Sequence, residues 1–467
     1  MFIKDSLYFC HELDMRNDMK KSGFILATLL FFSGMSHAEG HQWTLQECLD
    51  YALAHNISLQ KKKLAVKSAT EDVKGAKAAL LPSLSISTNQ NMGYKPWRDA
   101  GTISISNGSV DTKVNKTYYN GTYSLGASWT VWDGKKNINT VKLDRMLEQQ
   151  AALDSAVTAN SIQEKIAQLF VQILYLNEAV KVSEQALETS TKNVERGQKM
   201  VEVGKLSKAD VAQLTAQMES DRYNIVSSQS QLANYKLQLK QVLEITDDTP
   251  FDVAIPQTTA AMAMQPIPSL TAVYQEALLK RPEIEKSKLA IQSSDLNIKI
   301  AKAGWKPSVS LSASAGTGTS TQTDNAWGTQ LKTNFDMAAG VTIRVPILDN
   351  RKTKTAVNKA RISQENAILD LQEQQKTLYA TIEKYWLDAT TNQNKYTAAL
   401  ATEASEQQSY DLLSEQFHLG LKNIIELMTG KDKLMAAQLN TLQSKYLTIL
   451  NIELLKFYQG ESAIKGK

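Results

Sequence analysis

The chain carries one long pattern twice. Residues 44–87, ending in LLPSLSIS, align without gaps with residues 269–312, which end in WKPSVSLS, 225 positions further on. Later in each copy the offset is 216, which places Asp133 over Asp349 and Gly204 over Gly420. A tandem duplication of this kind predicts two copies of one supersecondary unit packed against each other.

The same order of elements is expected in both copies: helix, proline, strand, loop, strand, aspartate, long helix, glycine turn, helix. The predicted first repeat covers residues 39–249 and the second residues 269–467, with a proline-rich linker at 250–268. The change of offset must fall inside the strand region, where residues 90–118 and 317–333 are rich in Gly, Ser, Thr and Asn and are expected to be loops.

The sequence after Asp133 has the spacing of apolar residues that is typical of a coiled coil. Asp133 itself is the expected N-cap of the long helix. As a single helix, residues 134–203 would span roughly 100 Å. The helices expected at 44–79 and 205–245 have a similar combined length, so they could stack end to end beside it. Apolar residues recur every seven positions in this stretch, at Ile166, Ile173, Val180, Leu187, Val194 and Val201.

Four strands are expected, at 83–89, 119–131, 308–316 and 334–345. They form two hairpins, at about 83–131 and 308–346, and apolar residues alternate along them with small polar residues. Alternating segments of about 9 to 11 residues are typical of membrane β-barrels, although a soluble sandwich with one wet face shows the same pattern. Four strands cannot close a barrel, so two or three copies of the chain would be needed.

Residues 1–38 are expected to be a leader, with a signal peptide at 19–38. Two lysines follow Met19 and precede an apolar run, and Ser36-His37-Ala38 offers small residues for cleavage. The predicted mature chain therefore begins near Glu39 and is exported. It retains one cysteine, Cys48, which excludes a disulfide framework and is expected to be an inert packing residue. The net charge of +4 and the lack of a basic, aromatic-rich patch argue against nucleic acid as a partner.

In the order of these motifs and their duplication, the chain resembles the TolC family of outer-membrane efflux proteins. The resemblance implies a mainly α-helical fold with a membrane β-barrel, in a homotrimer with a 12-stranded barrel and a 12-helix tunnel. It also implies work as the exit duct of a tripartite efflux or type I secretion complex, with a periplasmic adaptor and an inner-membrane pump as partners. The resemblance places six side chains against outer-membrane lipid, at Tyr123, Leu125, Trp129, Phe335, Val341 and Ile343.

By the same resemblance, the two glycine turns form the periplasmic tips. The residues matching the adaptor-docking tips are Gly204, Leu206, Gly420 and Leu421. Asp210 and Glu426 are the candidate gate carboxylates at the entrance. Thr429 stands where the family has a second carboxylate, which argues against a doubled acidic ring.

Two other functions are consistent with parts of the pattern. A pore-less periplasmic coiled-coil scaffold or adaptor would need the long helices but not strands with one apolar face. An exported enzyme would need a catalytic constellation, and the sequence contains no recognisable one. No cofactor is expected, and the five histidines lack the spacing of metal ligands.

Overall fold

The computed structural model divides the chain into two compact units, residues 1–41 and 42–467, and only the second is described below. The expected leader at 1–38 and its signal peptide at 19–38 lie outside the described residues. So does part of the linker expected at 250–268. The structure describes residues 41–97, 100–105, 108–113, 116–247, 250–256, 260–323 and 325–461.

The principal helices occur in pairs whose members begin 225 or 216 positions apart, as the duplication predicts. Both longest helices have 67 residues, and both helices that follow them have 35. Within the described part of the chain, no helix has both the length and the apolar character needed to cross a membrane. The pairs are α1 (Leu45–His55) and α6 (Leu270–Lys280), α2 (Ile57–Ala78) and α7 (Pro282–Lys302), α3 (Lys136–Glu202) and α9 (Lys352–His418), and α4 (Lys208–Val242) and α10 (Ile424–Tyr458). The remaining helices are α5 (Ala260–Ala263), the 3-10 helix η1 (Ala303–Trp305) and α8 (Trp327–Thr333).

All four predicted strands are present, in one antiparallel sheet of order β2-β5-β7-β8. Its strands are β2 (Ser83–Tyr94), β5 (Thr117–Trp132), β7 (Ser308–Ser320) and β8 (Asp336–Arg344). The backbone of β3 (Ala100–Ile105) and β4 (Gly108–Lys113) forms a separate hairpin, and β1 (Gln42–Trp43) pairs in parallel with β6 (Asp252–Val253).

The expectation of plain loops at 90–118 and 317–333 is wrong. Strand β2 continues to Tyr94, the β3–β4 hairpin follows, and β7 continues to Ser320. In the second copy, α8 is tied back to the end of β7 because Gln330 accepts a hydrogen bond from the Ser320 backbone at 2.7 Å and donates one to the Asn325 carbonyl at 2.6 Å. Polar residues typical of loops here serve as partners for backbone groups, which composition alone does not reveal.

Asp133 caps the long helix, but not as its N-cap residue. The N-cap is Lys135, which has a φ of 72° in the left-handed region and makes no side-chain cap. The Asp133 carboxylate instead accepts a hydrogen bond from the Asn137 backbone N–H at 2.8 Å. Asp349 does the same for Thr353, also at 2.8 Å. Both long helices therefore begin with one strained turn held by an aspartate.

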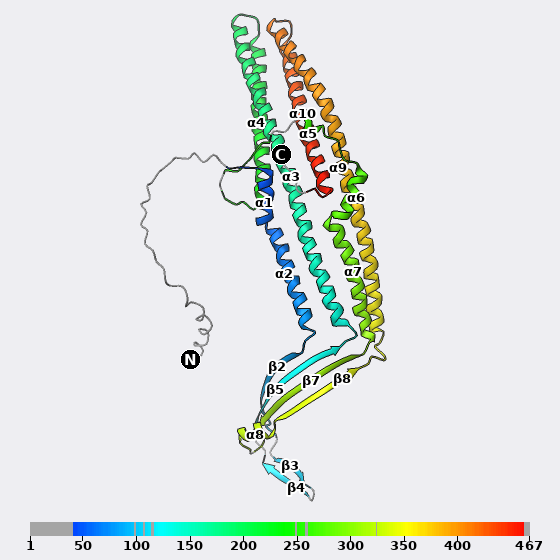
Figure 1. Ribbon diagram of the computed structural model, residues 1–467. Coiled ribbons are helices and arrows are strands. Elements are labelled where there is room, and N and C mark those ends of the chain that lie inside the picture. Colours follow the sequence, from blue (N-terminus) through cyan, green and yellow to red (C-terminus); the bar gives the residue numbers. More distant parts are fainter. Residues whose placement is uncertain are drawn as a thin grey trace, which may run out of the picture. The chain divides into compact units, whose positions relative to one another are not determined.

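The end-to-end stacking predicted for the shorter helices is confirmed. The Asn56 amide, between α1 and α2, donates a hydrogen bond to the carbonyl of Val242 at the end of α4, at 3.0 Å. In the second copy, Lys280 at the end of α6 donates to the Gln459 carbonyl just beyond α10, at 3.0 Å. Helix α3 packs against both α2 and α4, and α9 packs against both α7 and α10 (Figure 1).

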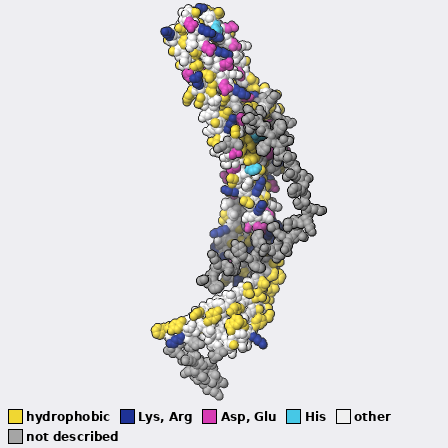
Figure 2. Space-filling model, turned by 90° about the vertical axis from the view of Figure 1, so that its left-hand side faces the viewer, with side chains coloured by type: hydrophobic (Ala, Val, Ile, Leu, Met, Phe, Trp, Pro, Cys, Tyr) yellow, Lys and Arg dark blue, Asp and Glu magenta, His cyan; other side chains and the backbone are white. Residues whose placement is uncertain are grey.

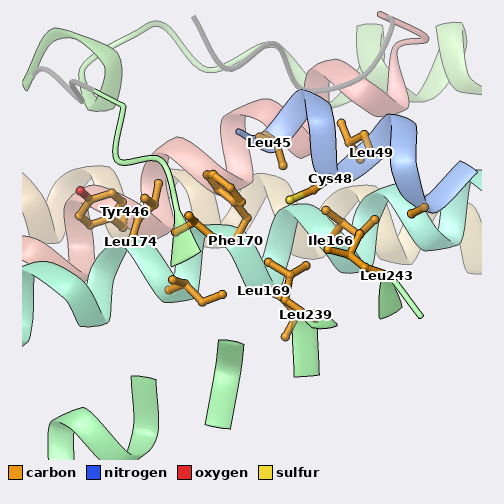
Figure 3. Packing of buried hydrophobic residues seen from close by; sticks show 13 residues of the cluster. Leu45, Cys48, Leu49, Ile166, Leu169, Phe170, Leu174, Leu239, Leu243 and Tyr446 are labelled. Carbon is orange, nitrogen blue, oxygen red and sulfur yellow. The ribbon is translucent and has the colours of Figure 1, made fainter. Parts of the chain in front are cut away.

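A cluster of buried apolar residues joins helices in the middle section of the helical region. Residues of α1, α3 and the end of α4 pack there with Tyr446 of α10, so the core contains both copies (Figure 3). Two residues of the predicted coiled-coil series, Ile166 and Ile173, are fully buried in this core. The heptad spacing therefore predicted the residues at its centre. Cys48 is also fully buried, and burial raises the pKa of its thiol to about 12, which agrees with an inert packing role.

Candidate functional site

The four-stranded sheet has one apolar face. Residues opposite each other in an antiparallel pair project to the same side. The register places Ile86 opposite Leu125, and Trp129 opposite Leu311, which itself lies opposite Val341. The other face is lined by serines: Ser87 and Ser124 are hydrogen-bonded at 2.7 Å. The sheet thus separates an apolar surface from a small polar one.

The apolar face is uncovered among the described residues. Ile86 is 85% exposed, Val341 64% and Ile343 65%. Figure 2 shows hydrophobic side chains gathered over the strands. Of the six side chains expected to face lipid, five are on strands of this face and Phe335 immediately precedes β8. An exposed apolar surface of this kind marks a site of contact with a membrane or another protein.

A β-bulge modifies the alternation at the helical end of β5. The pairing with β7 shifts between Thr130 and Trp132, so Trp132 rather than Val131 lies opposite Val309. The simple alternation placed Val131 on the apolar face. The bulge inserts one unpaired residue, as bulges do next to the end of a strand. It brings a second tryptophan, beside Trp129, to this end of the apolar face.

The sheet also has two open edges. Strands β2 and β8 are outermost, and each pairs with a single neighbour among the described residues. An open edge presents backbone groups that can pair with another strand. The sheet is therefore incomplete in one chain both at its edges and on its apolar face.

The two glycine turns have the same conformation at the opposite end of the long helices. Gly204 has a φ of 72° and Gly420 a φ of 73°. In each turn the residue after the glycine donates to a carbonyl five residues back, Lys205 to Met200 at 2.8 Å and Leu421 to Gln416 at 2.9 Å. This is the Schellman pattern, which requires the left-handed conformation that glycine adopts without strain.

Asp210 and Glu426 occupy equivalent positions just after these turns. Each is the third residue of its helix and completes a capping box, Asp210 with Ser207 and Glu426 with Asn423. The hydrogen bond from Ser207 lowers the pKa of Asp210. The pKa of Glu426 is also lowered, chiefly by its hydrogen bond from Lys422 at 2.8 Å. Both carboxylates have a local capping role that the sequence reasoning did not assign to them.

The candidate tip leucines differ in their surroundings. Leu421 is 70% exposed, whereas Leu206 packs against an apolar cluster beneath the turns. Thr429 has no carboxylate, and its hydroxyl donates a hydrogen bond to the Ile425 carbonyl at 2.8 Å. The two turns therefore share their backbone but present different side chains.

Sequence reasoning missed a buried ion pair near the turns. The Lys431 ammonium of α10 contacts the Asp221 carboxylate of α4 and the Ser190 hydroxyl of α3, and both charged side chains are almost inaccessible to solvent. A signal was present, because Asp221 falls between Met218 and Ile225 in the apolar rhythm of α4. A charge at such a core position indicates a specific buried partner.

Comparison with known proteins gives the same fold and one family. The family described as "Outer membrane efflux protein" matches residues 48–243 and 273–460. The outer membrane efflux protein BepC of Brucella suis biovar 1 (strain 1330) is 22% identical over 86% of this chain and 82% of its own length. The crystal structure of CusC matches with a TM-score of 0.74 at 16% identity, over 89% of this chain and 91% of that chain. That of the outer membrane protein VceC from Vibrio cholerae gives 0.71 at 17% identity, over 89% and 96%.

Proposed function

The chain belongs to the outer membrane efflux protein family, and from this premise we propose that it is the passive exit duct of a tripartite efflux or secretion complex. Members of the family are transport channels of the Gram-negative outer membrane and not enzymes, so this chain is an outer-membrane efflux channel. The proposal concerns its assembly, its partners and the residues at its two ends.

The observation that carries the proposal is the open four-stranded sheet with one apolar and one polar face. Two copies would supply eight strands, and a barrel of that size is filled by its own side chains. Three copies of a 4-stranded sheet supply 12 strands, which leaves a lumen for the small polar face. Pairing β2 of one chain with β8 of the next would close the ring and remove both open edges.

In this homotrimer the apolar face meets outer-membrane lipid. Leu125, Trp129, Val341 and Ile343 would lie in the bilayer, and the two tryptophans at the helical end of β5 suit its interface. The long helices of three chains would line the tunnel that continues through the periplasm.

The glycine turns would then form the entrance and meet a periplasmic adaptor, which connects the duct to an inner-membrane pump. The proposed contact residues are Gly204, Leu206, Gly420 and Leu421. The exposed Leu421 offers an apolar contact, while the buried side of Leu206 supports the turn. Asp210 and Glu426 are the proposed entrance carboxylates. Names of similar proteins support a role in export, as in "Toxin and drug export protein A" of Aggregatibacter actinomycetemcomitans.

The test is disulfide scanning between the sheet edges in isolated outer membranes. Cysteines placed along β2, at Ser85 and Ser87, are combined with one at Thr342 on β8, and the products are separated on denaturing gels. We expect covalent dimers and trimers, together with a trimer mass in detergent. The control pair Ser87→Cys and Ser124→Cys faces within one chain and should give no higher band. A folded monomer in detergent, or recovery of the protein in the soluble periplasmic fraction, would favour the pore-less scaffold.

A further inference from the structure

Both copies make the same hydrogen bond between the two helices that flank their strands. In the first copy, the Thr70 hydroxyl of α2 donates to the Glu148 carboxylate of α3 at 2.6 Å. The related positions, 225 and 216 residues further on, are Asp295 of α7 and Gln364 of α9. There the Gln364 amide donates a hydrogen bond to the Asp295 carboxylate. The repeat relation therefore holds for individual side-chain contacts and not only for the backbone.

The first copy is joined to the second where α3 packs against α7. The Lys286 ammonium of α7 forms an ion pair with the Asp154 carboxylate of α3 at 2.6 Å. Nearby, the Gln150 amide of α3 donates a hydrogen bond to the Ser293 hydroxyl of α7 at 3.5 Å. The side chains of Lys286 and Asp154 are 43% and 33% exposed, so their ion pair lies at the margin of the two packed helices.

The positions related to this ion pair carry the same two residue types. Lys286 corresponds to Lys61 of α2, and Asp154 corresponds to Asp370 of α9. Helices α2 and α9, both described in full, lie on opposite sides of the helical region and do not pack against each other (Figure 1). Lys61 and Asp370 are both exposed, and neither makes an ion pair or a side-chain hydrogen bond among the described residues. The two charges that would repeat the ion pair are therefore far apart within one chain.

Apolar residues beside these two charges are also uncovered. Leu64 of α2 is 61% exposed and Leu369 of α9 is 59% exposed. Their repeat-related counterparts, Leu289 of α7 and Leu153 of α3, are only partly exposed. The surfaces of α2 and α9 thus have the apolar residues and the opposite charges of the α3–α7 contact, but each surface lacks the other.

We propose that Lys61 of one chain and Asp370 of the next chain form an ion pair, so that α2 and α9 repeat between chains the contact that α7 and α3 make within one chain. The partner is a second copy of this chain, because a second copy brings the complementary charge and the complementary apolar surface to each helix. The inference rests on the proposed homotrimer. It adds a helical surface for recognition between chains to the edges of the sheet.

Cross-linking at repeat-related positions tests the contact. The between-chain pair is Ser68→Cys with Asn366→Cys, which are the positions related to Ser293 and Gln150. The matched control is the within-chain pair Ser293→Cys with Gln150→Cys. Each pair is made in a variant whose 2 natural cysteines are replaced by alanine, and a short thiol-reactive linker is added to isolated outer membranes. On denaturing gels we expect covalent dimers and trimers from the between-chain pair and no higher band from the control.

Charge reversal tests the ion pair itself, with the linking rate of the between-chain cysteines as the readout. Lys61→Asp and Asp370→Lys are introduced singly and then together. Each single variant places like charges opposite each other, and we expect linking to slow roughly 1.5- to 5-fold, the range of an exposed ion pair. The combined variant restores opposite charges and should link at the original rate. Lys62→Asp, at the neighbouring exposed lysine, is the control and should leave the rate unchanged.

The outcomes separate this inference from the proposed function. Unchanged linking in both single variants, or a combined variant as slow as the single ones, overturns the ion pair. If the between-chain cysteines give no product in membranes where cysteines at Ser87 and Thr342 link the sheet edges into trimers, the contact between α2 and α9 is wrong and the proposed function stands. If neither cysteine pair gives a covalent dimer or trimer, the proposed trimer is wrong and the inference falls with it.

Discussion

The strands and the helices use apolar residues in opposite ways. In α3, Ile166 and Ile173 are fully buried within one chain. In the sheet, Ile86 and Val341 remain mostly exposed although each lies opposite an apolar residue of the neighbouring strand. The helical region therefore builds its core from its own two repeats, whereas the apolar face of the sheet has no cover among the described residues of one chain. Hydrophobic periodicity identifies an apolar face in both regions but does not predict what covers that face.

The largest expected effect is a loss of stability when the buried ion pair between the two repeats is broken. Lys431→Met leaves the Asp221 carboxylate buried without its partner, and breaking such a pair costs about 3 to 5 kcal/mol. We expect a lower thermal unfolding temperature of the purified trimer. The neighbouring exposed Lys433→Met is the control and should change stability by less than about 0.5 kcal/mol.

The double variant Lys431→Met with Asp221→Leu sharpens that result. Replacing both members of a buried pair by apolar side chains of similar size is often neutral or stabilising. Recovery of the unfolding temperature would assign the loss in Lys431→Met to the stranded carboxylate. If both variants are as stable as the unmodified protein, the ion pair makes no net contribution to stability. The apolar contacts would then account for the stability of this region.

The second prediction concerns the apolar face of the sheet. Leu125→Arg or Val341→Arg should cost about 2 to 4 kcal/mol if these sites lie near the bilayer midplane. Ser124→Arg and Thr342→Arg, on the polar face, should be milder because in the proposed barrel their side chains would reach water in the lumen. Trimer yield in outer membranes measures the difference. Equal tolerance on both faces would remove the distinction between the two regions.

The sequence predicted the elements that rest on periodicity and duplication. The two pairs of longest helices, the four strands and the stacking of α4 on α2 follow from these patterns. The position of the bulge at Val131 does not, because it depends on pairing between β5 and β7, which are distant in sequence. The capping of Asn137 by Asp133 needs two left-handed residues that no periodicity predicts.

For the functional ends, the sequence predicted positions but not contacts. It placed Asp210 and Glu426 at equivalent points after the glycine turns, yet their capping boxes and the Lys422 partner depend on backbone geometry. Asp221 and Lys431 were visible only as interruptions of apolar stripes. Their pairing joins two helices from different repeats, and a single sequence does not show which residues of distant helices are in contact.

The third prediction concerns the glycine turns. No atom lies within 4 Å of the position that a Cβ would take at Gly204 or Gly420, so a larger side chain meets no clash there. A non-glycine residue in the left-handed region costs only about 1 to 2 kcal/mol. We therefore expect Gly204→Trp or Gly420→Trp to retain trimer assembly and membrane insertion but to lose export, because the proposed adaptor contact is blocked. Gly328→Trp, in α8 and also with open space at its Cβ, is the control. Retained export in both turn variants would argue against docking at these tips.

The smallest expected effect is at Glu426. If three Glu426 carboxylates form a ring at the entrance, Glu426→Gln should lower cation preference in planar bilayers, because acidic rings favour cations. The neighbouring Lys422 ammonium lies 2.8 Å from the carboxylate and offsets much of its charge, so the change should be modest. The same contact lowers the pKa of Glu426, which keeps the carboxylate ionised as the pH falls through the ordinary glutamate range. Cation preference should persist there and disappear only at lower pH.

Lys422→Gln is the informative partner of that variant. Removing the ammonium should raise cation preference and return the titration of Glu426 toward the ordinary range, the opposite direction to Glu426→Gln. Both effects should weaken with salt, since the Debye length falls from about 10 Å at 0.1 M to about 3 Å at 1 M. If neither substitution changes ion selectivity at low salt, Glu426 acts only as the capping residue of α10.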